Sequence, residues 1–212
     1  MQDRTRRSLR AEQVEATRAA LVAAGRARFA AAGFGGTSVE DIAREAGVTT
    51  GALYHHFPNK AELFATVFET IEAELRDRSA TAALAAGDEP LERLVAGFDA
   101  FLDAALEPDV QRIALVEAPA VLGLDRYHEI DERYGYTGIL ASVKAARSRG
   151  RIATEDPDTL AHLLLGALMH AGTLVARAEE PLEVRAAVGQ TLRQLLDGLA
   201  GPSRTSTREA PD

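Results

Sequence analysis

Residues 37–60 read TSVEDIAREAGVTTGALYHHFPNK, and this stretch predicts two short helices joined by a tight turn. Thr37 is expected to cap the first helix, and Glu40, three residues later, to complete a capping box. Gly47 breaks that helix, and Thr49 can cap the second one. Two helices at this spacing are typical of a helix-turn-helix.

A longer helix is predicted on each side of this stretch. Residues 13–32 repeat apolar side chains at helical spacing, and Gly33 follows them as a left-handed cap. Asn59, followed by Glu62, begins a long helix that should join the helix-turn-helix to the rest of the chain. Phe29 and Phe34 are expected to fill the small core beneath the second short helix.

With the preceding helix included, the segment resembles the DNA-binding domain of the tetracycline-repressor (TetR) family. The residues that carry the resemblance are Leu21, Ala24, Phe29, Gly33, Phe34, Thr37, Ile42, Ala43, Ala46, Gly47, Val48, Gly51, Leu53, Tyr54, His56, Phe57, Lys60 and Leu63. Beyond about Leu63 the resemblance is one of architecture only. It implies a DNA-binding transcriptional regulator, most often a repressor that a small molecule releases from a palindromic operator.

Composition favours an all-α fold. The chain has 212 residues, 46% of them hydrophobic and only 5% aromatic, and β-branched runs are scarce. Combined with the resemblance, which implies the roles of the two domains, this composition leads us to expect a three-helix DNA-binding domain and a C-terminal helical ligand-binding and dimerisation domain, with about nine helices in all. The sequence has no Cys and no uninterrupted apolar run of membrane-spanning length. We expect a cytoplasmic protein with no cofactor, disulfide or membrane partner.

Charge divides unevenly along the chain. Residues 1–60 hold nine Lys or Arg against six Asp or Glu, a net charge of +3, whereas residues 61–212 hold fifteen against twenty-six, a net charge of −11. The basic end can approach phosphates, and the acidic remainder should point away from DNA.

The predicted organisation has four parts. Residues 1–12 form a flexible basic arm, 13–62 the DNA-binding domain, 63–200 the ligand-binding and dimerisation domain, and 201–212 a disordered tail. Two interpretations of the arm stay open. It is either a solvated tail, which we favour, or a segment that enters the minor groove beside the main site.

The second short helix should enter the major groove with its first turn. The expected DNA contacts from this helix are threonine hydroxyls, a methyl group, and groups able to reach phosphates or base edges. Thr37 at the start of the first short helix and Lys60 at the start of the long helix are expected to contact phosphates. The complete set of expected DNA contacts is Thr37, Thr49, Thr50, Gly51, Ala52, Tyr54, His55 and Lys60. Each also has a structural interpretation, such as capping or packing, and for Leu53 and His56 we favour an inward position.

The last two predicted helices, about 158–178 and 182–199, carry broad apolar stripes. We expect them to pair across a two-fold axis, because one DNA-binding domain alone makes too few contacts for tight binding. The alternative is that both stripes are used up inside one monomer.

The middle helices offer candidates for an effector site. They are Phe98, Phe101, Arg112, Tyr127, Asp131, Tyr134, His162 and Met169. In a continuous helix Tyr127, Asp131 and Tyr134 would share one side, which suits an amphipathic or cationic ligand. Each of these residues could equally belong to the core.

Other functions fit less well. Asp158, His162 and His170 fall at multiples of four and could bind a divalent metal, but they lack a clear further ligand. The carboxylates around His128 suggest a solvated surface, and no phosphate loop or nucleophile motif is present, so we do not expect an enzyme. A DNA-binding protein without a ligand remains open.

Overall fold

The computed structural model describes residues 2–199, with side chains from residue 11 onward, and this part of the chain is built of helices joined by short turns and loops. Its elements are α1 (Gln2–Gly36), α2 (Val39–Glu45), α3 (Thr50–His56), α4 (Lys60–Ala85), α5 (Pro90–Ala104), η1 (Val110–Glu117), α6 (Ala118–Leu122), α7 (Leu124–Asp131), η2 (Glu132–Tyr136), α8 (Thr137–Ser148), α9 (Pro157–Ala176) and α10 (Pro181–Leu199). The stretches η1 and η2 are π-helical. The all-α prediction is confirmed.

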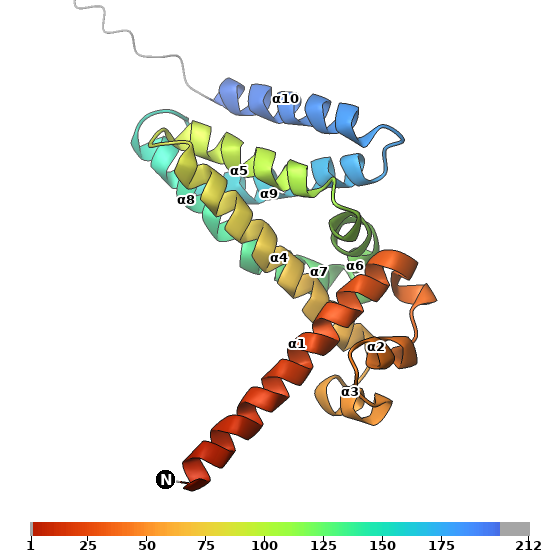
Figure 1. Ribbon diagram of the computed structural model, residues 1–212. Coiled ribbons are helices and arrows are strands. Elements are labelled where there is room, and N and C mark those ends of the chain that lie inside the picture. The colour runs from red at the N-terminus through yellow and green to blue at the C-terminus, as the bar shows by residue number, and fades with distance from the viewer. Residues whose placement is uncertain (1, 200–212) are drawn as a thin grey trace, which may run out of the picture.

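Helix α4 connects the two parts of the molecule. Figure 1 shows α2 and α3 grouped with the end of α1, and α4 running from this group into the bundle of α5, α8, α9 and α10. The N-terminal half of α4 has Leu63, Phe64 and Val67 fully buried. Phe64 meets Phe29 and Phe34, with ring centroids 5.1 and 5.4 Å apart, so the expected aromatic core of the small domain is present.

Helix α1 is longer than predicted. It runs from Gln2 and bends at Gly33, where φ is 74°, a value that favours glycine. The flexible arm expected over 1–12 is therefore wrong from Gln2 onward. Arg, Leu, Ala, Glu and Gln in this segment are good helix formers, so a helix already nucleated downstream extends through them at little cost. The predicted tail at 201–212 lies outside the described residues.

The start of α2 corrects the predicted capping box. Ser38, not Thr37, is the N-cap, and its side chain accepts a hydrogen bond of 3.1 Å from the Asp41 N–H. The Thr37 hydroxyl instead donates inward to the carbonyl oxygens of Gly33 and Arg28, at 2.7 and 3.1 Å. Adjacent hydroxyl residues leave the cap position ambiguous, and burial of Thr37 decides it. The caps expected at Thr49 and Asn59 are both formed.

This difference gives a test. Ser38→Ala should lower the free energy of unfolding by about 1 kcal/mol, because the first turn of α2 loses its side-chain acceptor. Chemical denaturation followed by circular dichroism measures the change. Ser148→Ala, at an exposed position near the end of α8, is the matched control and should cost less than about 0.5 kcal/mol. Equal costs for the two variants would contradict the assigned cap.

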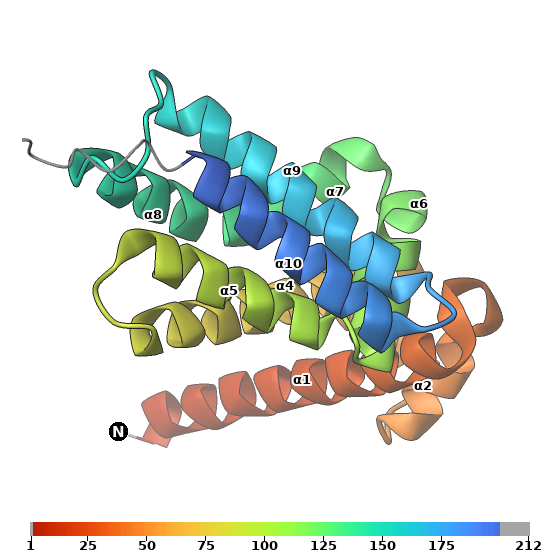
Figure 2. The ribbon, with the colours of Figure 1, turned by 90° about the horizontal axis from the view of Figure 1, so that it is seen from above.

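The C-terminal bundle is built on α5 and α9. Buried residues of α5 include Leu94, Phe98 and Phe101, and α9 buries Leu165 and Leu168. Figure 2 shows α10 running alongside α9 and across α5. Few residues of α10 are buried within the described chain.

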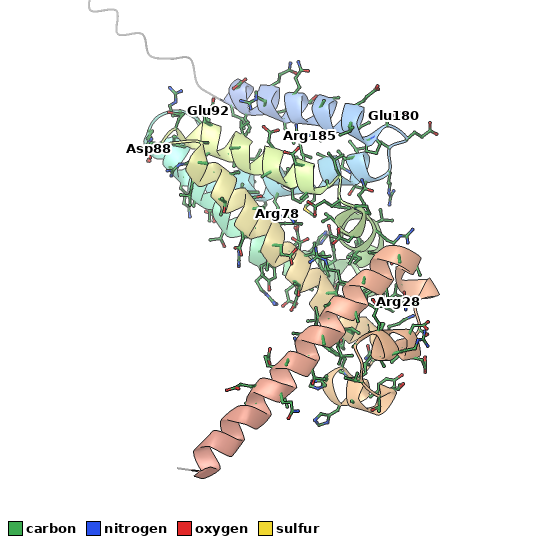
Figure 3. All side chains as sticks on the ribbon, viewed as in Figure 1. Arg28, Arg78, Asp88, Glu92, Glu180 and Arg185 are labelled. Carbon is green, nitrogen blue, oxygen red and sulfur yellow. The ribbon has the colours of Figure 1, made fainter. Side chains whose placement is uncertain are left out.

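An ion-pair cluster helps to hold α10 on α5. The Arg185 Nε donates to Asp103 Oδ1 at 2.7 Å, and its guanidinium also reaches the Asp99 carbonyl oxygen at 3.1 Å. Figure 3 shows Arg185 lying between the two helices.

Two π-helical stretches interrupt the expected helices. The first, η1, passes directly into α6, where Pro119 occupies the first turn. The second, η2, contains Gly135, where a Cβ atom would lie 2.8 Å from Leu165 Cδ1. The absent side chain thus allows η2 to approach α9 closely.

Within residues 2–199, α9 is the one helix long and apolar enough to cross a membrane by length and composition. The core helix of a soluble protein passes the same test. Here α9 packs on α5, α8, α10 and η1, and it buries Ala161, Leu164 and Val175 among others. We therefore interpret it as a core helix.

Candidate DNA-binding surface and effector cavity

Helix α3 has a buried face and an exposed face. Leu53 is fully buried, whereas Tyr54 is 50% exposed and Gly51 and His55 are exposed beside it. Thr49 accepts a hydrogen bond from the Ala52 N–H at 3.1 Å through its hydroxyl oxygen, so it is the N-cap. Thr49 is nevertheless exposed, and its hydroxyl proton remains available to donate to a group outside the protein.

The remaining positions of α3 are half-buried. Thr50 and Ala52, both in the first turn, and His56 are half-buried. The centroid of the His56 ring lies 5.7 Å from that of the His55 ring. The inward position of Leu53 is confirmed, but His56 is only partly covered. Helix α3 contains no acidic residue. Its N-terminal N–H groups and exposed hydroxyls therefore form a surface able to approach phosphates and base edges.

Lys60 and Thr37 face the interior of the small domain. Lys60 Nζ donates to the carbonyl oxygens of Phe34 and Thr37, at 2.7 and 2.9 Å, and lies 4.2 Å from the centroid of the Phe34 ring. The prediction that these two side chains contact phosphate therefore needs correction. Lys60 ties the start of α4 to the C-terminal end of α1 and the turn after it, whereas the Thr37 hydroxyl ties that turn back to α1. The sequence pattern does not reveal these carbonyl acceptors.

Lys60→Met tests this structural role, because it keeps the alkyl chain and removes the ammonium group. The free energy of unfolding should fall by about 1–2 kcal/mol as two carbonyl oxygens lose their donor and the cation–π contact is lost. Thermal or urea unfolding measures the loss. The matched control is Lys144→Met, at an exposed lysine of α8. Loss of operator affinity with unchanged stability would instead support a phosphate contact.

Ion pairs and hydrogen bonds join the small domain to the bundle. Arg26 on α1 contacts Asp109 and Glu74, each at 2.7 Å. These carboxylates raise the pKa of Arg26, first through the hydrogen bond to Glu74. Arg126 on α7 forms a two-pronged pair with Glu62 on α4, and this pair lowers the pKa of Glu62.

The end of α1 rests on η1. Arg112 donates to the carbonyl oxygens of Ala30 and Ala31, at 2.9 and 2.6 Å. The Glu117 carboxylate accepts the Phe34 N–H at 2.7 Å and lies where a Cβ on Gly33 would be. The assignment of Arg112 to the effector site is therefore wrong. It joins the two domains because the C-terminal carbonyls of α1 attract a cation.

A cavity of about 130 Å³ lies between α4, α5, α7, η2, α8 and α9. Five of the eight predicted effector residues line it, namely Phe98, Phe101, Asp131, Tyr134 and Met169. Tyr127 does not, because its ring stacks on Phe68 at 5.6 Å. His162 is exposed, and its Nδ1 lies 2.9 Å from the Asp158 carbonyl oxygen.

The cavity contains two buried carboxyl groups. Glu72 on α4 is 4% exposed and Asp131 on α7 is 5% exposed, and both line the cavity. Burial raises the pKa of Glu72 to about 8, with a further contribution from the charge of Asp131. Burial likewise raises the pKa of Asp131 to about 7, followed by the effect of Glu132. The same burial raises the pKa of Tyr127.

Sequence reasoning missed Glu72. A signal was available, because Glu72 follows Phe68 by four residues and precedes Leu75 by three, which places it on the apolar face of α4. An acidic residue on such a face is uncommon unless it has a partner or a function.

The metal alternative finds no support in this geometry. Among residues 11–199 no group of three His, Asp or Glu side chains is placed to hold a metal ion. Asp158 accepts a hydrogen bond from the Tyr136 hydroxyl at 2.8 Å, and His170 is exposed.

Comparisons with known proteins agree on one family. Residues 21–67 match the model described as "Bacterial regulatory proteins, tetR family", and residues 91–199 match "Tetracyclin repressor-like, C-terminal domain". The chain is 30% identical over 153 residues to the HTH-type transcriptional repressor SCO4008 of Streptomyces coelicolor, covering 71% of this chain and 76% of that protein. It is 28% identical over 163 residues to the Transposon Tn10 TetC protein of Escherichia coli, covering 75% and 80%.

A solved structure extends the agreement to the whole fold. A TetR-family transcriptional regulator from Pectobacterium atrosepticum superposes with a TM-score of 0.79 at 35% identity, covering 90% of this chain and 97% of that one. The likeness includes both the helix-turn-helix and the bundle. The chain belongs to the TetR family of DNA-binding transcriptional regulators.

Proposed function

We propose that the protein is a homodimeric repressor that binds a palindromic operator and leaves it when a small molecule occupies the cavity. The observation that carries this proposal is the position of α4. Its first turn closes the helix-turn-helix through Lys60, and its middle supplies Glu72, Leu75 and Arg76 to the cavity wall. One rigid element thus touches both sites. The family is one of transcriptional regulators rather than enzymes, and we place this member in the cytoplasm.

The DNA contacts proposed are those on the exposed face and first turn of α3. Thr49 and Thr50 would offer hydroxyls to base edges, and Tyr54 and His55 would reach phosphates or a base edge. Gly51 and Ala52 would allow the backbone to approach the groove closely and present a methyl group to thymine.

The dimer is proposed to form through α9 and α10. These helices expose Leu163, Leu174, Leu182 and Leu195, at 66, 45, 72 and 56% of their surface. Leu163 and Leu174 are eleven residues apart, so they lie on the same side of α9. Two copies would bury these leucines in a four-helix interface and present two α3 helices to successive half-sites.

Release follows if the ligand prefers a different tilt of α4. A ligand that contacts Glu72, Leu75 and Arg76 touches both the bundle and the middle of α4. A small rotation of α4 there changes the separation of the two α3 helices at its other end. A ligand with higher affinity for a dimer whose α3 helices no longer match successive half-sites shifts the population toward that dimer. By linkage, DNA must weaken ligand binding by the same factor.

A footprint tests the operator. DNase protection of the intergenic DNA flanking the gene should show a site of two-fold symmetry, with half-sites one helical turn or a multiple of it apart. Protection without sequence preference would contradict a specific regulator.

The dimer requires a separate measurement. Leu163→Glu combined with Leu174→Glu should convert the dimer to a monomer in sedimentation equilibrium and abolish the footprint. Leu124→Glu, at a 62% exposed leucine of α7, is the matched control and should stay dimeric. A double variant that stays dimeric would place the interface elsewhere.

A further inference from the structure

Most of the residues that line the cavity are apolar. Leu75, Leu94, Phe98, Phe101 and Ile139 are among the lining residues. Two arginines also line it, but each has a partner at the surface. Arg76 pairs with Asp77 at 2.8 Å and stacks on the ring of Tyr134, and Arg93 pairs with Asp88 at 3.2 Å. Neither neutralises the buried carboxyl groups.

Among the residues that the structure describes, those two carboxyl groups have no hydrogen-bond or ion-pair partner. Glu72 Oε1 and Asp131 Oδ1 are buried and make no hydrogen bond within the described residues. Neither residue takes part in an ion pair in that part of the chain. Leaving a buried polar group unsatisfied costs about 1–3 kcal/mol, and a charged one costs more. An apolar residue at either position would avoid this cost. The presence of both carboxyl groups therefore indicates a ligand that satisfies them when it fills the cavity.

We propose that the cavity binds an organic cation, with its charged nitrogen between Glu72 and Asp131 and its apolar body against Phe98, Phe101 and Leu168. This inference rests on the proposed function, since it names the chemical class of the effector. A cation would satisfy both carboxylates, whereas a neutral donor leaves at least one of them poorly solvated. An anion would be repelled by both.

Size and aromatic content narrow the class further. Since a water molecule needs about 10–15 Å³ of cavity, the space suits a ligand of roughly ten non-hydrogen atoms. Rings of Phe98, Phe101 and Tyr134 line the same space and favour either an aromatic body or a cation over a ring face. A protonated amine carrying one ring or a short branched chain fits both conditions.

Binding should also be linked to protons. The titratable and charged groups around Glu72 are Arg76 on its own helix, Arg93 on α5, Tyr127 and Asp131 on α7, and Glu132 and Tyr134 on η2. With a pKa of about 8, Glu72 is mostly protonated at pH 7 in the empty cavity. An entering cation favours the ionised form, so the complex releases a proton and the affinity increases as pH rises from 6 toward 8.

The experiment uses matched probes on the full chain without DNA. Isothermal titration calorimetry compares 2-phenylethylamine with 2-phenylethanol and phenylacetate, and repeats the comparison for tetraethylammonium and benzyltrimethylammonium. We expect at least one cation to bind about tenfold or more tightly than the neutral and anionic probes. Titration in buffers of different ionisation enthalpy should reveal the released proton.

Variants link this preference to the carboxyl pair. Glu72→Gln and Asp131→Asn should each reduce the preference for the cation to less than about threefold. Glu180→Gln, at an exposed residue between α9 and α10 that Figure 3 labels, is the matched control and should leave it intact. Failure of every cation to bind, equal or better binding of a neutral or anionic probe, or an unchanged preference in both cavity variants would overturn the proposal. Operator binding is measured separately, so its absence would reject the regulator without deciding the ligand class.

Discussion

Replacing Thr50 and Tyr54 together by alanine should weaken operator binding by at least about 100-fold without unfolding the small domain. Each contact to a base edge or phosphate contributes about 1–3 kcal/mol, and a symmetric dimer loses every contact twice. Stability should change little, because Tyr54 is 50% exposed and the core of the domain is made by other residues. Fluorescence anisotropy on the footprinted operator, at one fixed salt concentration, measures the loss.

The matched control is Tyr136→Ala, at a partly exposed tyrosine of η2 far from the helix-turn-helix. It removes a ring and a hydrogen bond to Asp158 but should leave operator affinity within about threefold of the parent protein. A double variant at Thr50 and Tyr54 that also stays within this range would show that α3 does not read the operator.

The helix-turn-helix was predictable because its signals are local. Caps, breaking glycines and the spacing of Leu53 and Phe57 act within a few residues of one another, and each specifies the same structure. The failures have the complementary cause. Thr37 and Lys60 look like outward polar groups in sequence, but both donate hydrogen bonds inward. Their acceptors are carbonyl oxygens at the C-terminal end of α1 and, for Lys60, also the Thr37 carbonyl. Such acceptors come from tertiary structure, and no periodicity reports them.

The cavity was predictable only in part. Phe98, Phe101 and Met169 belong to apolar stripes on α5 and α9 that face one bundle. The position of Tyr127 was not predictable, because its ring stacks on Phe68 of α4, and such a contact comes from tertiary structure. The role of Glu72 could not be recognised from residue type alone, since α4 carries several other acidic residues that face solvent or form ion pairs. Only its position between Phe68 and Leu75 distinguishes it.

Glu72→Gln should stabilise the empty protein at alkaline pH, by on the order of 4–5 kcal/mol at pH 8.5. The pKa of Glu72 is raised in the folded state to about 8 from 4.5. Between these values the folded chain retains a proton that the unfolded chain has released, so stability is complete below about pH 4.5 and falls as pH rises toward 8. Glutamine has the same shape and no proton to lose, so its contribution stays constant.

Ionisation of Asp131 also lowers the stability of the protein as pH rises, and Glu72→Gln does not remove this effect. The Asp131 pKa of about 7 means that this carboxyl group ionises first, and its charge then opposes ionisation of Glu72. The variant should therefore keep a shallower decline up to about pH 7 and flatten above it. Acidic groups with lowered pKa values, such as Asp109 and Glu62, have the opposite effect: the protein loses their contribution to stability only as pH falls below about 4.5. The pH range in which they matter is therefore separate from that of Glu72.

Urea unfolding at pH 5.5, 7.0 and 8.5, at one protein concentration, measures this difference, since the stability of a dimer depends on concentration. Glu180→Gln removes the same charge from an exposed site and should follow the parent protein at every pH. If Glu72→Gln and the parent protein lose stability in parallel from pH 5.5 to 8.5, Glu72 is already ionised in the folded state. A charged Glu72 would need a compensating cation inside the empty protein, and Arg76 and Arg93, the nearest candidates, are held by Asp77 and Asp88 at the surface. If the stability difference between Glu72→Gln and the parent protein does not change with pH, one of these surface pairs must therefore open and its arginine must turn into the cavity.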